Sequence, residues 1–126
     1  MPPTELSGRG TRVLIIEHHP ATAGILRRFL ELFGYEVRVA YTGDDGVRLA
    51  EEWLPQVVCE VCVPGLDGWG IATALRGNPA TAHARLIAVT AHDSDADRMR
   101  SQQVGFECHL AKPVNPGLLL ELLATP

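Results

Sequence analysis

Hydrophobic residues in this chain follow two alternating patterns. Short apolar runs rich in β-branched residues predict buried strands at 12–16, 35–40, 57–59, 86–90 and 106–111. Apolar residues at helical spacing predict helices between Pro20 and Gly34 and between Thr42 and Pro55, and further helices are predicted over 68–76 and 117–124. A polar helix that ends at Gly105 is predicted over 94–104. Five alternating strands and helices predict an α/β fold, a doubly wound parallel sheet with helices on both faces.

Capping signals support these helix boundaries. Gly34 stands where a C-terminal cap belongs, and Thr42 with Asp45 forms an N-terminal capping pattern. Asn115 followed by Pro116 is typical of the start of a last helix. The helix ends are therefore predicted by a signal that is independent of the hydrophobic spacing.

Length and composition narrow the classes of protein. The 126 residues predict one domain over 12–126, preceded by a polar, disordered lead over 1–11. Because the chain ends directly after the last helix, we expect a stand-alone domain. A net charge of −4 argues against nucleic acid and anionic membranes as partners, and no apolar run is long enough to span a bilayer. Three cysteines, an odd number, favour the reducing cytoplasm.

Polar residues stand at the carboxyl ends of the predicted strands. Glu17 and His18 follow the first strand, and Glu60 follows the third. Thr90 ends the fourth strand and Lys112 follows the fifth. Because these strand ends meet at one edge of a parallel sheet, we expect the five residues to converge there. Carboxylates, a hydroxyl and an ammonium group at one place suit the handling of a phosphoryl group.

In order and spacing, these motifs resemble a response regulator receiver domain of two-component signalling over residues 12–124. The resemblance is carried by residues 13–17, 34–37, 60–68, 90–91 and 112–113. It implies a flavodoxin-like fold with five strands in the order 2-1-3-4-5. It also implies protein partners, either a histidine kinase or a downstream signalling protein.

The resemblance further implies a role for each matching residue. Glu60 stands at the phosphoacceptor position, and Glu17 with His18 stands where two acidic residues help to bind Mg²⁺. The remaining family positions are the conserved-type hydroxyl, the small residue, the lysine and the switch aromatic, which here are Thr90, Ala91, Lys112 and His109.

Two of these positions depart from the family pattern. Receivers normally have Asp where this chain has Glu60, which is about 1.5 Å longer and displaces the nucleophile. His18 replaces an oxygen ligand with an imidazole, which suits Mg²⁺ poorly. We therefore predict weak or lost Mg²⁺ binding, no cofactor, no enzymatic activity, and signalling without ordinary aspartyl phosphorylation. The longer Glu60 carboxylate is expected to reach toward Lys112 and Thr90.

Two alternatives stay open. In the first alternative, the domain still accepts a phosphoryl group from a histidine kinase. In the second it is a metal or redox protein, because Cys59 and Cys62 have redox spacing and lie near His18 and Glu60. Cys59 is expected to be a buried strand residue, and His19 a surface residue without a chemical role.

The last helix predicts an interaction surface. Five of its six residues from 118 to 123 are leucines, more than one buried face needs. We expect Leu119, Leu122 and Leu123 to face the sheet, which leaves Leu118 or Leu120 exposed. The face formed by the fourth helix, fifth strand and fifth helix is the usual partner surface of receivers, so a homodimer or another protein contact is predicted there.

Overall fold

The computed structural model describes residues 10–61, 68–90, 99, 102–103, 105–111 and 115–125. Of six residues in these ranges it describes the backbone alone: Gly68, Trp69, Thr90, Cys108, His109 and Ala111. In this described part of the chain, no helix is long and apolar enough to cross a membrane.

The centre of the fold is a five-stranded sheet in the order β2-β1-β3-β4-β5. Its strands are β1 (Arg12–Glu17), β2 (Glu36–Ala40), β3 (Val57–Val61), β4 (Arg85–Thr90) and β5 (Cys108–Ala111). Every neighbouring pair is parallel. The predicted fold class and strand order are confirmed. β3 runs past the predicted end at residue 59, and β5 begins two residues later than predicted.

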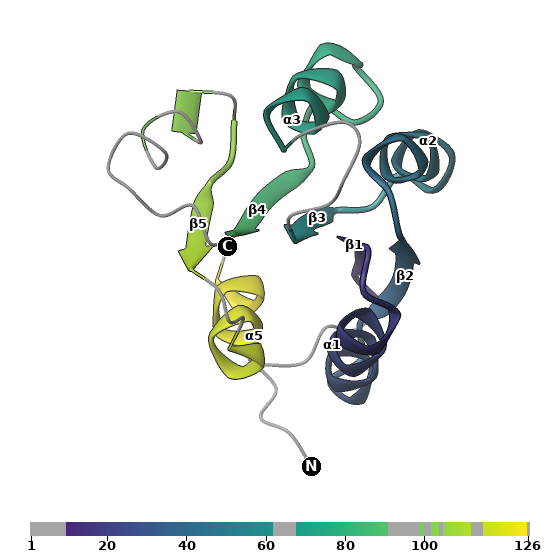
Figure 1. The fold of residues 1–126 in the computed structure, drawn as a ribbon, viewed down its shortest axis with the longest axis vertical. Coiled ribbons are helices and arrows are strands. Elements are labelled where there is room, and N and C mark those ends of the chain that lie inside the picture. Colours follow the sequence, from purple (N-terminus) through teal and green to yellow (C-terminus); the bar gives the residue numbers. More distant parts are fainter. Residues whose placement is uncertain are drawn as a thin grey trace.

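Helices cover both faces of the sheet. They are α1 (Pro20–Leu32), α2 (Gly43–Trp53), α3 (Gly68–Gly77) and α5 (Pro116–Ala124). Figure 1 shows α1 and α5 on one side of the sheet and α2 and α3 on the other. The helix predicted over 94–104 lies mainly outside the described residues, although residues 99, 102 and 103 are helical.

The two faces of β1 explain the two hydrophobic cores. Val13 and Ile15 belong to the cluster that contains residues of α1 and α5. Leu14 and Ile16 belong to the cluster that contains residues of α2 and α3. Successive side chains of a strand point to opposite faces, so a continuous apolar run fills both cores at once.

Most of the predicted caps are present. Thr42 Oγ1 accepts a hydrogen bond from the Asp45 N–H at 3.1 Å, and Asn115 Oδ1 accepts one from the Leu118 N–H at 3.1 Å. Each such cap contributes about 1 kcal/mol to helix stability. Gly34 follows α1 with a φ of 92°, a conformation that favours glycine.

The described part of the chain includes two residues of the predicted lead, Gly10 and Thr11. The Gly10 N–H donates to the Gly34 carbonyl at 2.8 Å, and the Glu36 N–H donates to the Thr11 carbonyl at 2.9 Å. These bonds continue the pairing of β1 with the segment that enters β2. The rest of the predicted lead, residues 1–9, lies outside the described part.

One prediction about α5 is wrong. Leu120 is 4% exposed and packs in the same core as Leu119 and Leu123, whereas Leu122 is half-buried. Leu120 therefore cannot form part of an interaction surface. Leu118 is 43% exposed and remains available. Because α5 is apolar on nearly every side, its spacing alone does not reveal which leucines meet the sheet.

The contact of α2 with β1 gives a test of this packing. A Cβ at Gly46 would overlap Ile16 Cδ1 and lie 2.8 Å from Ile16 Cγ1, and Ile16 is fully buried. We expect Gly46→Ala to lower the free energy of unfolding in urea by about 1–3 kcal/mol. Gly24→Ala in α1 is the matched control, because its Cβ would meet nothing within 4 Å. It should raise stability by up to about 1 kcal/mol. Equal stabilisation by both variants would contradict the packing of Gly46 on Ile16.

Candidate functional site

Two buried carboxylates lie at the carboxyl ends of β1 and β3, two adjacent inner strands of the sheet. Glu17 ends β1 and is 1% exposed, while Glu60 lies near the end of β3 and is 5% exposed. In the parallel register Glu60 pairs with Ile16, and Glu17 pairs with Val61. The two acids are thus one residue apart in register on adjacent strands, at the edge where the sequence predicts a site.

The pKa of the Cys59 thiol is affected by the negative charges of both acids. Burial, followed by the negative charges of Glu60 and Glu17, raises the pKa of the Cys59 thiol to about 12. The thiol is therefore neutral at pH 7 and packs in the core with Ile15 and Val61. This agrees with the expectation of a buried strand cysteine. Its predicted redox partner, Cys62, lies outside the described residues.

The turn from β1 into α1 carries two exposed imidazoles. The rings of His18 and His19 lie with their centroids 4.1 Å apart and their planes at 39°. The His19 N–H donates to Glu17 Oε1 at 2.9 Å. One nitrogen of each imidazole and one carboxylate oxygen of Glu17 lie within 4.8 Å of one another.

His19 is exposed, as predicted for a surface residue, and it lies beside Glu17 and His18. No role in chemistry was predicted for it from the sequence. The chain bends at His18, immediately after β1, and the His19 N–H then donates to Glu17 Oε1. The useful signal was the pair of adjacent histidines placed between a strand-end acid and Pro20.

The described backbone places Thr90 at the same edge of the sheet as Glu17 and Glu60. Thr90 ends β4, where it pairs with Ala111, and His109 pairs with Ala88. Lys112 and Ala91 lie outside the described residues. Contact of the Glu60 carboxylate with Lys112 and Thr90 therefore stays a prediction, as do the roles that the resemblance implies for these residues.

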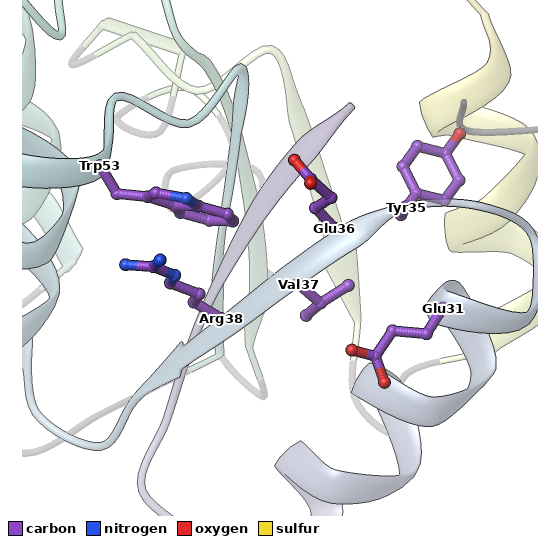
Figure 2. Close-up of a pocket in the computed structure, with 6 residues that line it drawn as sticks. All are labelled: Glu31, Tyr35, Glu36, Val37, Arg38 and Trp53. Carbon is purple, nitrogen blue, oxygen red and sulfur yellow. The ribbon is translucent and has the colours of Figure 1, made fainter. Parts of the chain in front are cut away.

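A separate cavity lies at the start of β2, away from the strand ends that carry Glu17 and Glu60. It measures about 400 Å³ and is lined by Glu31, Tyr35, Glu36, Val37, Arg38 and Trp53. Figure 2 shows the Arg38 guanidinium beside the Trp53 ring, 4.9 Å from its centroid. Ligands of open parallel sheets bind beyond the carboxyl ends of the strands, whereas this hollow lies toward the amino end of an edge strand. We therefore do not assign the chemistry of the fold to it.

The fold and these strand ends define a receiver-type α/β domain, and comparison with known proteins identifies its family. The chain belongs to the response regulator receiver domain family, whose model matches residues 13–124. It is similar to protein PilH of Pseudomonas aeruginosa, with 33% identity over 113 residues that cover 89% of this chain and 93% of PilH. It is 29% identical to the response regulator PleD of Caulobacter vibrioides over 86% of this chain, which spans 24% of PleD.

Solved structures agree with this assignment. A receiver domain of a sensor histidine kinase from Pseudomonas aeruginosa, with a magnesium ion in its active-site cleft, superposes with a TM-score of 0.80. The two share 29% identity over 90% of this chain and 94% of that one. A response regulator from Burkholderia multivorans has a TM-score of 0.76 and 31% identity over 90% of this chain and 92% of its own. This chain is therefore a receiver domain of two-component signalling.

Magnesium, which the receiver domain from Pseudomonas aeruginosa holds in its active-site cleft, is the ion whose fit to these residues can be examined. The Glu17 carboxylate is a suitable hard ligand, but His18 presents an exposed imidazole at the next position. Mg²⁺ takes oxygen ligands in near-octahedral geometry, and it seldom binds imidazole. The donors at the end of β1 thus do not fit the ion that the family implies.

The environment of Cys59 predicts an unreactive thiol. A pKa of about 12, in place of the usual 9.0, lowers the thiolate fraction at pH 8 by about a thousandfold. In a Cys62→Ser/Cys108→Ser variant, Cys59 should react with a disulfide reagent at least about a thousandfold more slowly in the native state than in denaturant. The measurement is the absorbance of the released thiol over time. Native and denatured rates within tenfold would contradict the buried, neutral state.

Proposed function

We propose that this receiver domain signals through protein–protein contact, without ordinary phosphorylation at Glu60 and without catalytic activity of its own. The observation that carries the proposal is the donor set at the end of β1. One buried carboxylate is followed there by two imidazoles. Phosphoryl transfer in a receiver requires an ion that neutralises the developing charge, and imidazole nitrogen is a poor ligand for Mg²⁺.

The nucleophile position supports the same proposal. Glu60 has one methylene more than the aspartate of the family, which displaces its oxygens by about 1.5 Å. In-line transfer is sensitive to displacements of about this size. Glu60 is also buried within the end of β3. The metal ligands and the acceptor therefore depart from the family pattern in ways that weaken the same reaction.

Receiver domains interact with protein partners such as histidine kinases, and this family membership supports a protein partner here. We propose that the partner is a histidine kinase or a downstream signalling protein. Recognition then relies on the surface of the folded domain rather than on a covalent change at Glu60.

A phosphodonor experiment tests the proposal. The purified chain is incubated with acetyl phosphate and Mg²⁺, and its intact mass is measured. We expect no stable phosphoryl adduct, because the acceptor is displaced and Mg²⁺ lacks an oxygen ligand. The double variant His18→Asp/Glu60→Asp restores the acidic pattern of the family and should take up one phosphoryl group.

The single variants separate the two causes. His18→Asp repairs the ion site alone, and Glu60→Asp repairs the acceptor alone, so each should be phosphorylated less than the double variant. A stable adduct on Glu60 of the unmodified chain would favour the alternative, a receiver that still accepts a phosphoryl group from a kinase. A fully active Glu60→Asp variant would show that His18 does not limit the reaction.

We further propose that the domain self-associates through the face that includes α5. Leu118 supports this, because it is a large apolar side chain left exposed in the first turn of α5. A single exposed leucine is common on monomeric proteins, so the matched comparison with another exposed leucine decides its role.

That comparison is Leu118→Glu against Leu32→Glu. Leu32 lies at the end of α1 and is 77% exposed, so glutamate is tolerated there without loss of packing. We expect light scattering at high concentration to show a dimer for the unmodified chain and for Leu32→Glu, and a monomer for Leu118→Glu. A strictly monomeric unmodified chain would exclude the dimer.

A further inference from the structure

We propose that Glu17, His18 and His19 form a binding site for a divalent transition-metal ion, with Zn²⁺ as the ion that these donors suit. The site differs from the magnesium site of receivers in its third ligand, which comes from the β1–α1 turn rather than from β3. It shares His18 with the function proposed above but requires nothing of Glu60, so a separate measurement tests it.

The distances between the three donors support this site. Two imidazole nitrogens and one carboxylate oxygen lie within 4.8 Å of one another. Around a tetrahedral Zn²⁺ with bonds of about 2.0–2.1 Å, donor atoms lie about 3.3 Å apart. The donors must therefore close by at most about 1.5 Å. Both histidine side chains are exposed, so rotation about their χ angles can supply this movement.

The Glu17 carboxylate supplies the fixed and charged part of the site. It is almost completely buried, and among the described residues its one hydrogen bond comes from the neutral N–H of His19. A buried carboxylate with so little compensation is costly, and a nearby cation lowers that cost. The position of Glu17 therefore favours a cation at the point where the two imidazoles also gather.

The backbone holds the two histidines in place. His19 is the N-cap of α1, its carbonyl accepts a hydrogen bond from the Ala23 N–H at 3.0 Å, and Pro20 follows at the first helical position. His19 makes no side-chain capping bond, so its imidazole is available to an ion. His18 lies between this anchor and the buried end of β1. Such preorganisation reduces the ordering that ion binding requires.

The donor chemistry selects the class of ion. Two imidazoles and one carboxylate match a common three-ligand zinc set, which leaves one position for water. Imidazole also suits Cu²⁺ and Ni²⁺, whereas Mg²⁺ and Ca²⁺ prefer oxygen ligands alone. The presence of His18 in place of an acid thus weakens the binding of Mg²⁺ and also changes which ion the site prefers.

The test is calorimetric titration of the full chain with ZnCl₂ in the presence of excess Mg²⁺ and a non-chelating reductant. We expect one Zn²⁺ per chain and a thermal midpoint that rises with Zn²⁺ concentration, because the ion binds the folded state. His18→Ala and His19→Ala should each weaken binding by at least about tenfold. His19→Ala keeps the backbone N–H that bonds to Glu17, so it removes the ligand and spares that contact.

His83→Ala is the matched control. His83 is exposed in the turn between α3 and β4 and lies outside the donor cluster, so its loss should leave the Zn²⁺ affinity unchanged. Absence of saturable binding, or His18→Ala and His19→Ala proteins that bind as the unmodified chain does, would overturn the proposal. Equal weakening by His83→Ala would also overturn it. None of these outcomes bears on phosphorylation of Glu60, so the two proposals fail separately.

Discussion

The burial of β1 and β3 is the constraint on which the rest of the structure depends. Both strands are central, and helices cover both faces of the sheet, so every residue over 13–17 and 57–61 is buried. A strand in this position must be apolar along its length, and its last residue must be placed at the edge that ligands reach. Glu17 and Glu60 are the exceptions to the apolar rule, and the burial of a carboxylate is costly unless a hydrogen bond or an opposite charge compensates it.

Features of the fold that depend on neighbouring residues could be predicted from the sequence, whereas features that depend on distant contacts could not. The end of β1 at Glu17 and the Thr42 cap follow from a few neighbouring residues, and both are present. The buried face of α5 does not, because a helix with leucine on nearly every side is oriented by what it packs against. Arg76 is another example. Its guanidinium donates to the carbonyls of Ala82, Ala84 and Gly105, and no spacing rule joins the end of α3 to a residue that precedes β5.

The same contrast between predictable and unpredictable features applies to the candidate site. Parallel topology predicted that strand-end residues gather at one edge of the sheet. The strand order that the receiver resemblance implies correctly placed Glu17 and Glu60 on adjacent strands. The closeness of His19 to Glu17 could not be predicted, since it depends on a bend of the chain at His18 and on the hydrogen bond from the His19 N–H to Glu17 Oε1. Such turns arise from a few backbone dihedral angles, which hydrophobic periodicity does not encode.

His18 links phosphoryl chemistry to metal identity at this edge. A carboxylate at this position supplies a hard oxygen, which Mg²⁺ needs and which phosphoryl transfer uses indirectly through that ion. An imidazole there lowers the affinity for Mg²⁺ and, with a second imidazole beside it, raises the affinity for softer ions. The same side chain therefore acts on both properties in opposite directions. Under the proposal that Glu17, His18 and His19 bind Zn²⁺, this receiver keeps a buried acid at the end of β1, and the ion that compensates its charge is a transition metal rather than Mg²⁺.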